Sequence, residues 1–128
     1  MSKSSLEAGL KVRREVMGDE FVDRALNNAT EWDQPLQDMV NEHAWGNTWV
    51  RDGLPRKTRS LVTISMLAAL KCSQELKGHV RGALRNGCTV DEIREVLLHS
   101  AVYCGAPAAI DAMRSAKEVI DAWEEGSN

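Results

Sequence analysis

Three side chains that could do chemistry together lie within one short segment. The sequence KCSQELKGHV contains Cys72, Glu75 and His79. Offsets of three and four residues place these side chains on one face of a helix. A thiol, a carboxylate and an imidazole so arranged fit redox chemistry, metal binding or acid–base catalysis. An ordinary surface helix with a Glu–His pair is the simplest interpretation, and it stays open beside the other three.

Acid–base chemistry requires the fewest additional groups. A redox site would need a second thiol to resolve an oxidised Cys72, and Glu75 occupies the place of that partner in a C-x-x-C motif. A metal site would need at least a third ligand, which His99 could supply only through the tertiary fold. An acid–base site needs a carboxylate that orients an imidazole and raises its pKa. An acid–base pair of His79 and Glu75, with no metal ion, is therefore the functional hypothesis that needs the fewest further groups, and the ordinary surface helix stays open beside it.

A cluster of cationic side chains surrounds Pro55, at the expected start of a long helix. It comprises Arg51, Arg56, Lys57 and Arg59. A solvated, charged loop is one interpretation of this cluster. Guanidinium groups and helix N-termini both favour anions, so the functional hypothesis is a site for carboxylates.

A second histidine lies in a mostly apolar segment. His99 occurs in LLHSAVY, four residues after Glu95. A histidine in such a place is commonly a hydrogen-bonded core residue, yet a buried imidazole still needs a partner. The small residues of YCGAPAA (103–109) follow, and they predict a tight turn or space for a ligand or a neighbouring backbone.

The composition indicates a globular chain and excludes several classes of function. The 128 residues are 43% hydrophobic and 27% charged, which fits one domain spanning 1–128. The formal charge of −3 disfavours nucleic-acid binding. No apolar run reaches membrane-spanning length, and MSKSSLEAGL lacks a signal-peptide core. We therefore expect a soluble, cytoplasmic protein that contacts neither nucleic acid nor membrane.

The residue pattern predicts an all-α fold, a bundle of about six to seven helices. Strand signals are nearly absent, whereas residues that favour helices are abundant. The expected helices cover roughly 6–17, 20–28, 33–44, 55–70, 73–85, 90–104 and 107–123. The stretch WGNTWVRDGLP (45–55) is expected to be a turn-rich connection. The helix at 55–70 is apolar nearly all round, which predicts burial in the core or between subunits.

Local signals mark several helix ends. Ser5 is a possible N-cap of the first helix, and Gly18 is its expected stop. Pro35 fits the first turn of the third helix. Asn86-Gly87 is a plausible left-handed stop, and the segment 89–92 has the form of a capping box.

Four segments of the chain together carry a likeness to a known family. They are WGNTWVRDGL, TRSLVTISMLAAL, the Glu75-Leu-x-x-His79 segment and RGALRNGCTVDEIREVLLHSAVYCGAPAAIDAMR. The combination resembles the carboxymuconolactone decarboxylase family, of the alkylhydroperoxidase-like superfamily, over roughly residues 8–123. The resemblance implies an all-α homo-oligomer, typically a homohexamer built as a trimer of dimers.

The resemblance also implies a reaction and roles for the candidate residues. The reaction converts 4-carboxymuconolactone to β-ketoadipate enol-lactone and carbon dioxide in protocatechuate catabolism. The substrate is a small dianionic lactone that serves as its own electron sink, so no cofactor is expected. Arg59, with Arg51 or Arg56 assisting, would hold its acetate arm. His79 would donate a proton, and His99 would stabilise the carbonyl oxygen.

Thiol peroxidases of the same superfamily provide the alternative function. They use two cysteines separated by two residues, with a histidine four residues after the second. Cys72 and His79 match this pattern, whereas Glu75 replaces the second thiol. The upstream glutamate of the peroxidases falls on Ser60, and the histidine between their thiols falls on Gln74. These departures disfavour peroxidase activity; a non-catalytic helical scaffold is the remaining alternative.

Overall fold

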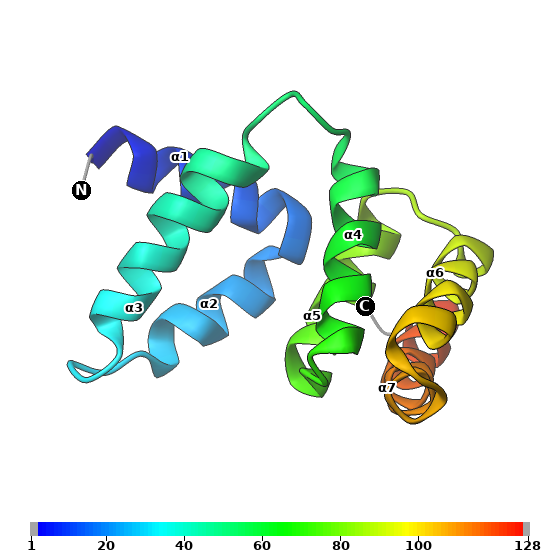
Figure 1. The fold of residues 1–128 in the computed structure, drawn as a ribbon. Coiled ribbons are helices and arrows are strands. Elements are labelled where there is room, and N and C mark those ends of the chain that lie inside the picture. The colour runs from blue at the N-terminus through cyan, green and yellow to red at the C-terminus, as the bar shows by residue number, and fades with distance from the viewer. Residues whose placement is uncertain (1–2, 127–128) are drawn as a thin grey trace. The chain divides into compact units, whose positions relative to one another are not determined.

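Helices make up nearly all of the chain that the structure describes, residues 3–126 of a computed structural model. Within that range there are seven α-helices and one π-helix, and no strand (Figure 1). The prediction of an all-α fold is confirmed. Contacts divide the chain into two compact units, Met1–Arg56 and Lys57–Asn128, and each is described by itself. The expectation of a single domain stays a prediction.

The first unit contains four consecutive helices. They are α1 (Lys3–Met17), α2 (Asp19–Asn28), α3 (Gln34–Met39) and the π-helix η1 (Val40–Trp49). Gly18, at φ 92°, separates α1 from α2, and Pro35 lies in the first turn of α3, as predicted. Ser5 is not a cap, because the helical hydrogen bonding of α1 begins upstream of it.

The π-helix η1 corrects the sequence analysis. The segment 45–55 was expected to be a turn-rich connection, but its first five residues continue the helix. Trp45 and Trp49 are buried, and their rings stack with centroids 4.9 Å apart. Burial of these two large rings against the core of the first unit favours a helical path despite the turn-forming residues between them.

The backbones of α1 and η1 touch where two glycines lie. A Cβ atom on Gly46 would lie 2.3 Å from the carbonyl oxygen of Ser5. A Cβ atom on Gly9 would lie 1.9 Å from the carbonyl oxygen of Asn41. Only residues without a side chain allow the two helices to approach this closely.

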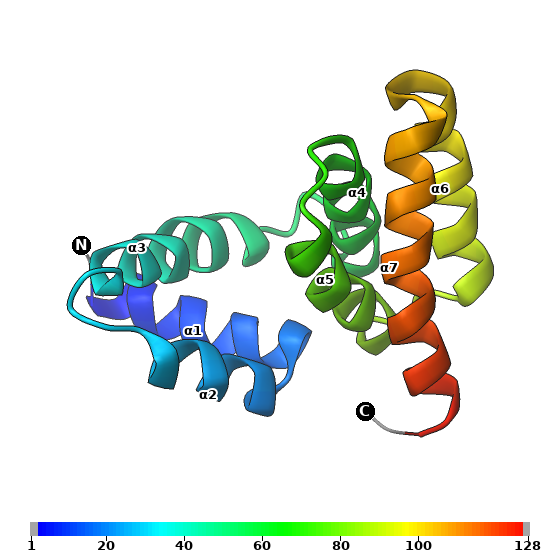
Figure 2. The ribbon, with the colours of Figure 1, turned by 90° about the horizontal axis from the view of Figure 1, so that it is seen from below.

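The second unit contains the remaining helices, apart from the first residue of α4. They are α4 (Arg56–Ala69), α5 (Ser73–Arg85), α6 (Val90–Cys104) and α7 (Ala106–Glu124). Its core includes four side chains at most 1% exposed, Ile64, Leu76, Ile93 and Leu97. The antiparallel helices α6 and α7 lie side by side, and α7 also packs against α5 (Figure 2). Gly105, at φ 96°, makes the tight turn between α6 and α7.

The predicted capping box at the start of α6 is confirmed. The Glu92 amide donates to Thr89 Oγ1 at 3.0 Å, and the Thr89 amide donates to Glu92 Oε1 at 2.9 Å. Gly87, at φ 92°, lies just after the end of α5, where the sequence indicates a left-handed stop. These signals fix the connection between α5 and α6.

Helix α4 buries one face and exposes another. Ile64 and Ala68 are buried, whereas Val62 and Met66 are 38% and 59% exposed. In the single chain, therefore, α4 is not covered all round. Burial of its apolar outer face between subunits stays a prediction. No helix in the described range has the length and apolarity needed to cross a membrane.

Candidate active site

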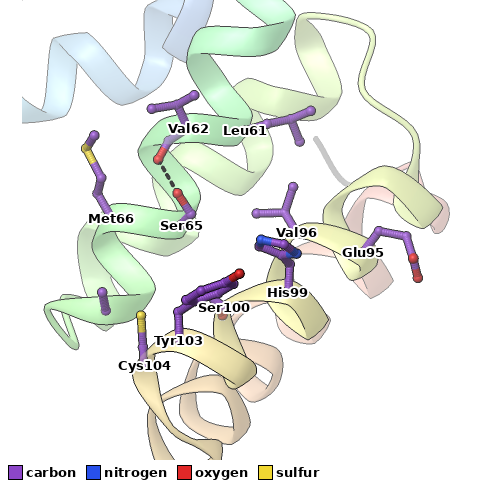
Figure 3. A pocket seen from close by; sticks show the side chains of 11 residues that line it. Leu61, Val62, Ser65, Met66, Glu95, Val96, His99, Ser100, Tyr103 and Cys104 are labelled. Atoms are coloured by element: carbon purple, nitrogen blue, oxygen red, sulfur yellow. Dashed lines mark hydrogen bonds between the residues drawn. The ribbon is translucent and has the colours of Figure 1, made fainter.

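A cavity of about 690 Å³ lies between α4 and α6 in the second unit (Figure 3). Its wall on α4 is mainly apolar and includes Leu61, Val62 and Met66. Residues three and four positions apart on each helix point to the same side, which is why two short stretches line the cavity. The volume is in the range typical of small-molecule sites.

The wall on α6 carries most of the polar groups of the cavity. His99, Tyr103 and Cys104 line it, and Glu95 lies at its edge. Figure 3 shows the rings of His99 and Tyr103 beside one another, facing the space between the two helices. The carboxylate of Glu95 points away from both rings. The cavity therefore offers an imidazole and a phenol next to an apolar wall.

Two serine hydroxyls in the cavity are engaged with the backbone. Ser65 Oγ donates to the carbonyl oxygen of Val62, and Ser100 Oγ donates to that of Leu97, both at 2.7 Å. Their protons are therefore used within the helices. The imidazole of His99 and the phenol of Tyr103 are the groups best placed to donate to a ligand.

The other predicted histidine lies on a different helix. His79 is half-buried on α5, and it is not among the residues that line the α4–α6 cavity. Glu75, one turn earlier on α5, is exposed. The roles assigned to this pair stay predictions.

Two of the three predicted arginines line a pocket in the first unit. Arg51 and Arg56 surround a space of about 290 Å³ together with Trp49 and Asp52. Arg56 Nη1 also lies 2.6 Å from Glu15 Oε2. Two guanidinium groups beside an aromatic wall are suited to a carboxylate.

Arg59 lies on α4, in the second unit. It is not among the residues that line the α4–α6 cavity, but it precedes Val62 by three residues and Met66 by seven, so helical register places it on the same side of α4 as those two lining residues. Its side chain is half-buried. Of the three predicted arginines, Arg59 is therefore the nearest in sequence to the residues of α4 that line the cavity.

The three cysteines are all free thiols. Cys72 precedes α5, and its Sγ donates to the carbonyl oxygen of Leu70 at 3.8 Å. Cys88 is buried, and burial raises the pKa of its thiol, which lowers its reactivity. Cys104 is exposed and lines the cavity. Within residues 3–126 no group of three or more His, Cys, Asp or Glu side chains is arranged to hold a metal ion.

The chain is similar in sequence to known proteins along most of its length. Residues 34–118 match the model of the carboxymuconolactone decarboxylase family. The chain is 48% identical over 115 residues to the nitrosuccinic acid decarboxylase of Metarhizium robertsii, covering 90% of this chain and 80% of the relative. It is also 48% identical over 111 residues to the 4-carboxymuconolactone decarboxylase of Acinetobacter baylyi, covering 87% and 83%.

These similarities define the class of protein. An all-α chain that matches this family over more than half its length, with two decarboxylases at 48% identity, is an enzyme of the carboxy-lyase class. The chain belongs to the carboxymuconolactone decarboxylase family. The resemblance inferred from the sequence is thereby confirmed.

Tyr103 was not among the predicted site residues. In the sequence it is the first residue of YCGAPAA (103–109), a segment for which only a tight turn or space for a ligand or a neighbouring backbone was expected. Its offset of four residues from His99 was the available signal, since that spacing puts both rings on one helical face. Met66 and Val62 could not be found in this way, because their proximity to α6 depends on the tertiary fold.

Proposed function

We propose that the chain decarboxylates a small dianionic acid without a cofactor, and that 4-carboxymuconolactone is the first substrate to test. The relatives named for 4-carboxymuconolactone and for nitrosuccinic acid support the reaction class and leave the choice of acid open. The observation that carries the proposal is the imidazole of His99 opening on a cavity with an apolar wall. With 4-carboxymuconolactone as substrate, the reaction belongs to protocatechuate catabolism in the cytoplasm.

The two candidate acids make the same chemical demand on a protein. Each has a carboxylate whose bonding electrons can pass to an acceptor, a conjugated lactone carbonyl in one acid and a nitro group in the other. Each also keeps a second carboxylate on a CH₂ arm. A site that serves either acid must hold the retained carboxylate, accept the leaving one in a poorly solvating place and deliver a proton to carbon.

The α4–α6 cavity fits the last two of these demands. The walls formed by Val62 and Met66 solvate a carboxylate poorly, which favours a transition state in which its charge spreads into the acceptor. The carbon–carbon bond breaks, carbon dioxide leaves, and the electron pair moves onto the lactone oxygen or the nitro group. A proton from the His99 imidazolium then forms the new C–H bond. Solvent returns a proton to His99.

The retained carboxylate requires a cation. We assign this role to Arg59, because helical register places it on the same side of α4 as the cavity-lining Val62 and Met66. Arg51 and Arg56 keep the assisting role that the sequence suggests for them. His79, oriented by Glu75, is the competing proton donor, and a direct comparison of the two histidines decides between them.

The experiment adds purified protein to freshly prepared 4-carboxymuconolactone or nitrosuccinate and follows carbon dioxide release. We expect turnover of at least one acid, and His99→Ala should lower it by about 10²–10⁴-fold. His79→Ala is the matched comparison, and circular dichroism checks that both variants fold. A loss confined to His79→Ala would move the proton donor to α5. No turnover of either acid would contradict the proposed substrates.

The same preparation tests the thiol-dependent alternative. We expect Cys72→Ser to decarboxylate as fast as the wild type. Consumption of a hydroperoxide that disappears in Cys72→Ser would instead support peroxidase activity. We further propose that the active form is a homo-oligomer, with the homohexamer as the expected state.

A further inference from the structure

The N-terminal part of α4 is tied to the short segment that joins α5 to α6. Asn86, directly after the last residue of α5, donates a hydrogen bond from Nδ2 to Ser60 Oγ at 2.9 Å. Two residues later, the thiol of Cys88 donates to the carbonyl oxygen of Lys57 at 3.5 Å. Arg59, the proposed cation for the retained carboxylate, lies between Lys57 and Ser60 in the chain. Two contacts therefore hold the backbone on either side of this arginine.

The contact between Asn86 and Ser60 is the stronger of the two. Ser60 is 0% exposed, so water cannot replace the amide as the partner of its hydroxyl. The thiol of Cys88 is a weak donor. Lys57 Nζ also lies 3.0 Å from Glu92 Oε1, but both side chains are more than a third exposed, and such ion pairs contribute little. Asn86 is therefore the residue of this segment best able to fix the start of α4.

The backbone of Asn86 is itself fixed at the end of α5. Its amide N–H donates to the carbonyl oxygen of Gly82 at 2.9 Å. Gly87, at φ 92°, turns the chain immediately afterwards, and the capping box of α6 begins two residues later. The side chain of Asn86 therefore acts on Ser60 from a well-defined position between two helices.

The position of this part of α4 matters because an arginine reaches its ligand through a long side chain. Several rotatable bonds separate the Cα atom of Arg59 from its guanidinium group, and ordering them on binding is entropically unfavourable. A backbone that is already fixed leaves only the side chain to be ordered. A misplacement of about 1 Å in a substrate-positioning group can lower enzymatic efficiency by about 100-fold.

We propose that Asn86 is a positioning residue for Arg59 and that it acts through the hydroxyl of Ser60. The hydrogen bond fixes the part of α4 from which the guanidinium group of Arg59 reaches the retained carboxylate of the substrate. The inference rests on the proposed role of Arg59 in binding that carboxylate. Asn86 contributes to binding in this way and leaves the proton transfer at His99 unchanged.

A double-mutant cycle separates this role from a general effect on stability. The four proteins are the wild type, Asn86→Ala, Arg59→Gln and the variant with both changes. Succinate is the probe, because it carries a carboxylate on a CH₂ arm and has no group that could accept the electrons of a decarboxylation. Calorimetric titration gives the dissociation constant of succinate for each protein.

We expect Asn86→Ala to weaken the binding of succinate by about three- to tenfold. In the Arg59→Gln background the same change should have an effect of less than about twofold, because the cation that Asn86 positions is gone. For an acid that turns over, KM should rise by a similar factor while kcat stays within about twofold. Equal weakening in both backgrounds would show that Asn86 acts independently of Arg59 and would overturn the inference.

Ser60→Ala removes the same contact from the other side. Alanine is a strong helix former of similar size, so this variant should fold even if Asn86→Ala does not. It should weaken succinate binding by a similar factor, and adding Asn86→Ala to it should have no further effect. Unchanged binding in the folded variants would overturn the positioning role.

Asn28→Ala is the matched control for the loss of an asparagine at a helix end. Asn28 is exposed and is the last residue of α2, in the first unit. Its replacement should leave the dissociation constant of succinate unchanged.

The outcomes distinguish this inference from the proposed reaction. Turnover of 4-carboxymuconolactone or nitrosuccinate together with an uncoupled cycle would overturn the positioning role alone. A coupled cycle without turnover of either acid would overturn the proposed substrates alone. If the wild type does not bind succinate, or if Arg59→Gln binds it equally well, the assignment of Arg59 fails and the role of Asn86 fails with it.

Discussion

The imidazole of His99 and the phenol ring of Tyr103 lie one turn apart on α6, with centroids 5.1 Å apart and planes inclined at 37°. Both rings line the α4–α6 cavity. A tilted contact of this kind restricts the rotamers of the imidazole, because turning it would lose the ring–ring contact. Tyr103 is therefore a positioning residue for His99 in the proposed reaction.

Removing the ring of Tyr103 should slow turnover. Tyr103→Leu is expected to lower kcat by about two- to tenfold, the equivalent of one aromatic pair, with little change in KM. Tyr103→Phe keeps the ring and should retain most of the activity. Steady-state kinetics of the two variants provide the measurement. Equal losses in both would show that the hydroxyl acts directly and that the ring does not position His99.

Loss of the proposed cation should weaken substrate binding. Arg59→Gln is expected to raise KM by about 10–100-fold, because a charge-assisted hydrogen bond to the retained carboxylate is lost. Arg24→Gln is the matched control, since Arg24 is exposed on α2 and pairs with Glu20. Arg51→Gln should show a smaller rise. An unchanged KM for Arg59→Gln would remove Arg59 from the site.

The glycine contact between α1 and η1 should be intolerant of a side chain. Gly46→Ala places a methyl group against the carbonyl oxygen of Ser5, which is backbone and cannot turn away. We expect a loss of about 1–3 kcal/mol in the free energy of unfolding, measured by urea denaturation. Gly53→Ala is the control, because nothing lies within 4 Å of its added Cβ atom. Equal stability of the two variants would contradict the close contact.

The capping box should make part of the stability depend on pH. The backbone amide of Thr89, aided by the ammonium of Lys57, holds the pKa of Glu92 below its ordinary value of 4.5. A lowered pKa in the folded state stabilises the fold above the unfolded pKa, and this contribution is lost as the pH falls through the folded value. Glu92→Gln should therefore reduce the difference in urea midpoint between pH 6 and pH 3.

Glu7→Gln controls for the loss of one exposed surface carboxylate. The wild type and Glu92→Gln could instead show the same difference in urea midpoint between the two pH values. The carboxylate of Glu92 would then make no pH-dependent contribution to the free energy of unfolding. The measurement uses the full chain in both cases.

Local signals in the sequence were sufficient to predict most of the helices. The capping box, Gly18 and Pro35 each act through neighbouring backbone groups, so their effect can be read from a few residues. The π-helix could not be predicted, because residues such as Gly46 and Asn47 also favour a turn. Burial of Trp45 and Trp49, which the sequence does not reveal, decides in favour of the helix.

The candidate site was predicted only in part. His99 could be singled out as an imidazole in an apolar segment, but its cavity depends on the packing of α6 against α4. Pairing Glu75 with His79 relied on helical spacing alone. Spacing shows which side chains share a face and does not show whether they bond to each other or face a cavity.

The buried hydroxyl of Ser60 limits how this fold could change its chemistry. Ser60 is 0% exposed, and its Oγ accepts a hydrogen bond of 2.9 Å from Asn86 Nδ2, at the end of α5. The related peroxidases carry a glutamate at the corresponding position. Introducing that acid here would bury a carboxylate and break the link to Asn86, whereas a cysteine at the exposed position 75 would meet no such obstacle. An evolutionary path between the two enzyme types therefore has to remodel the protein interior as well as its reactive surface.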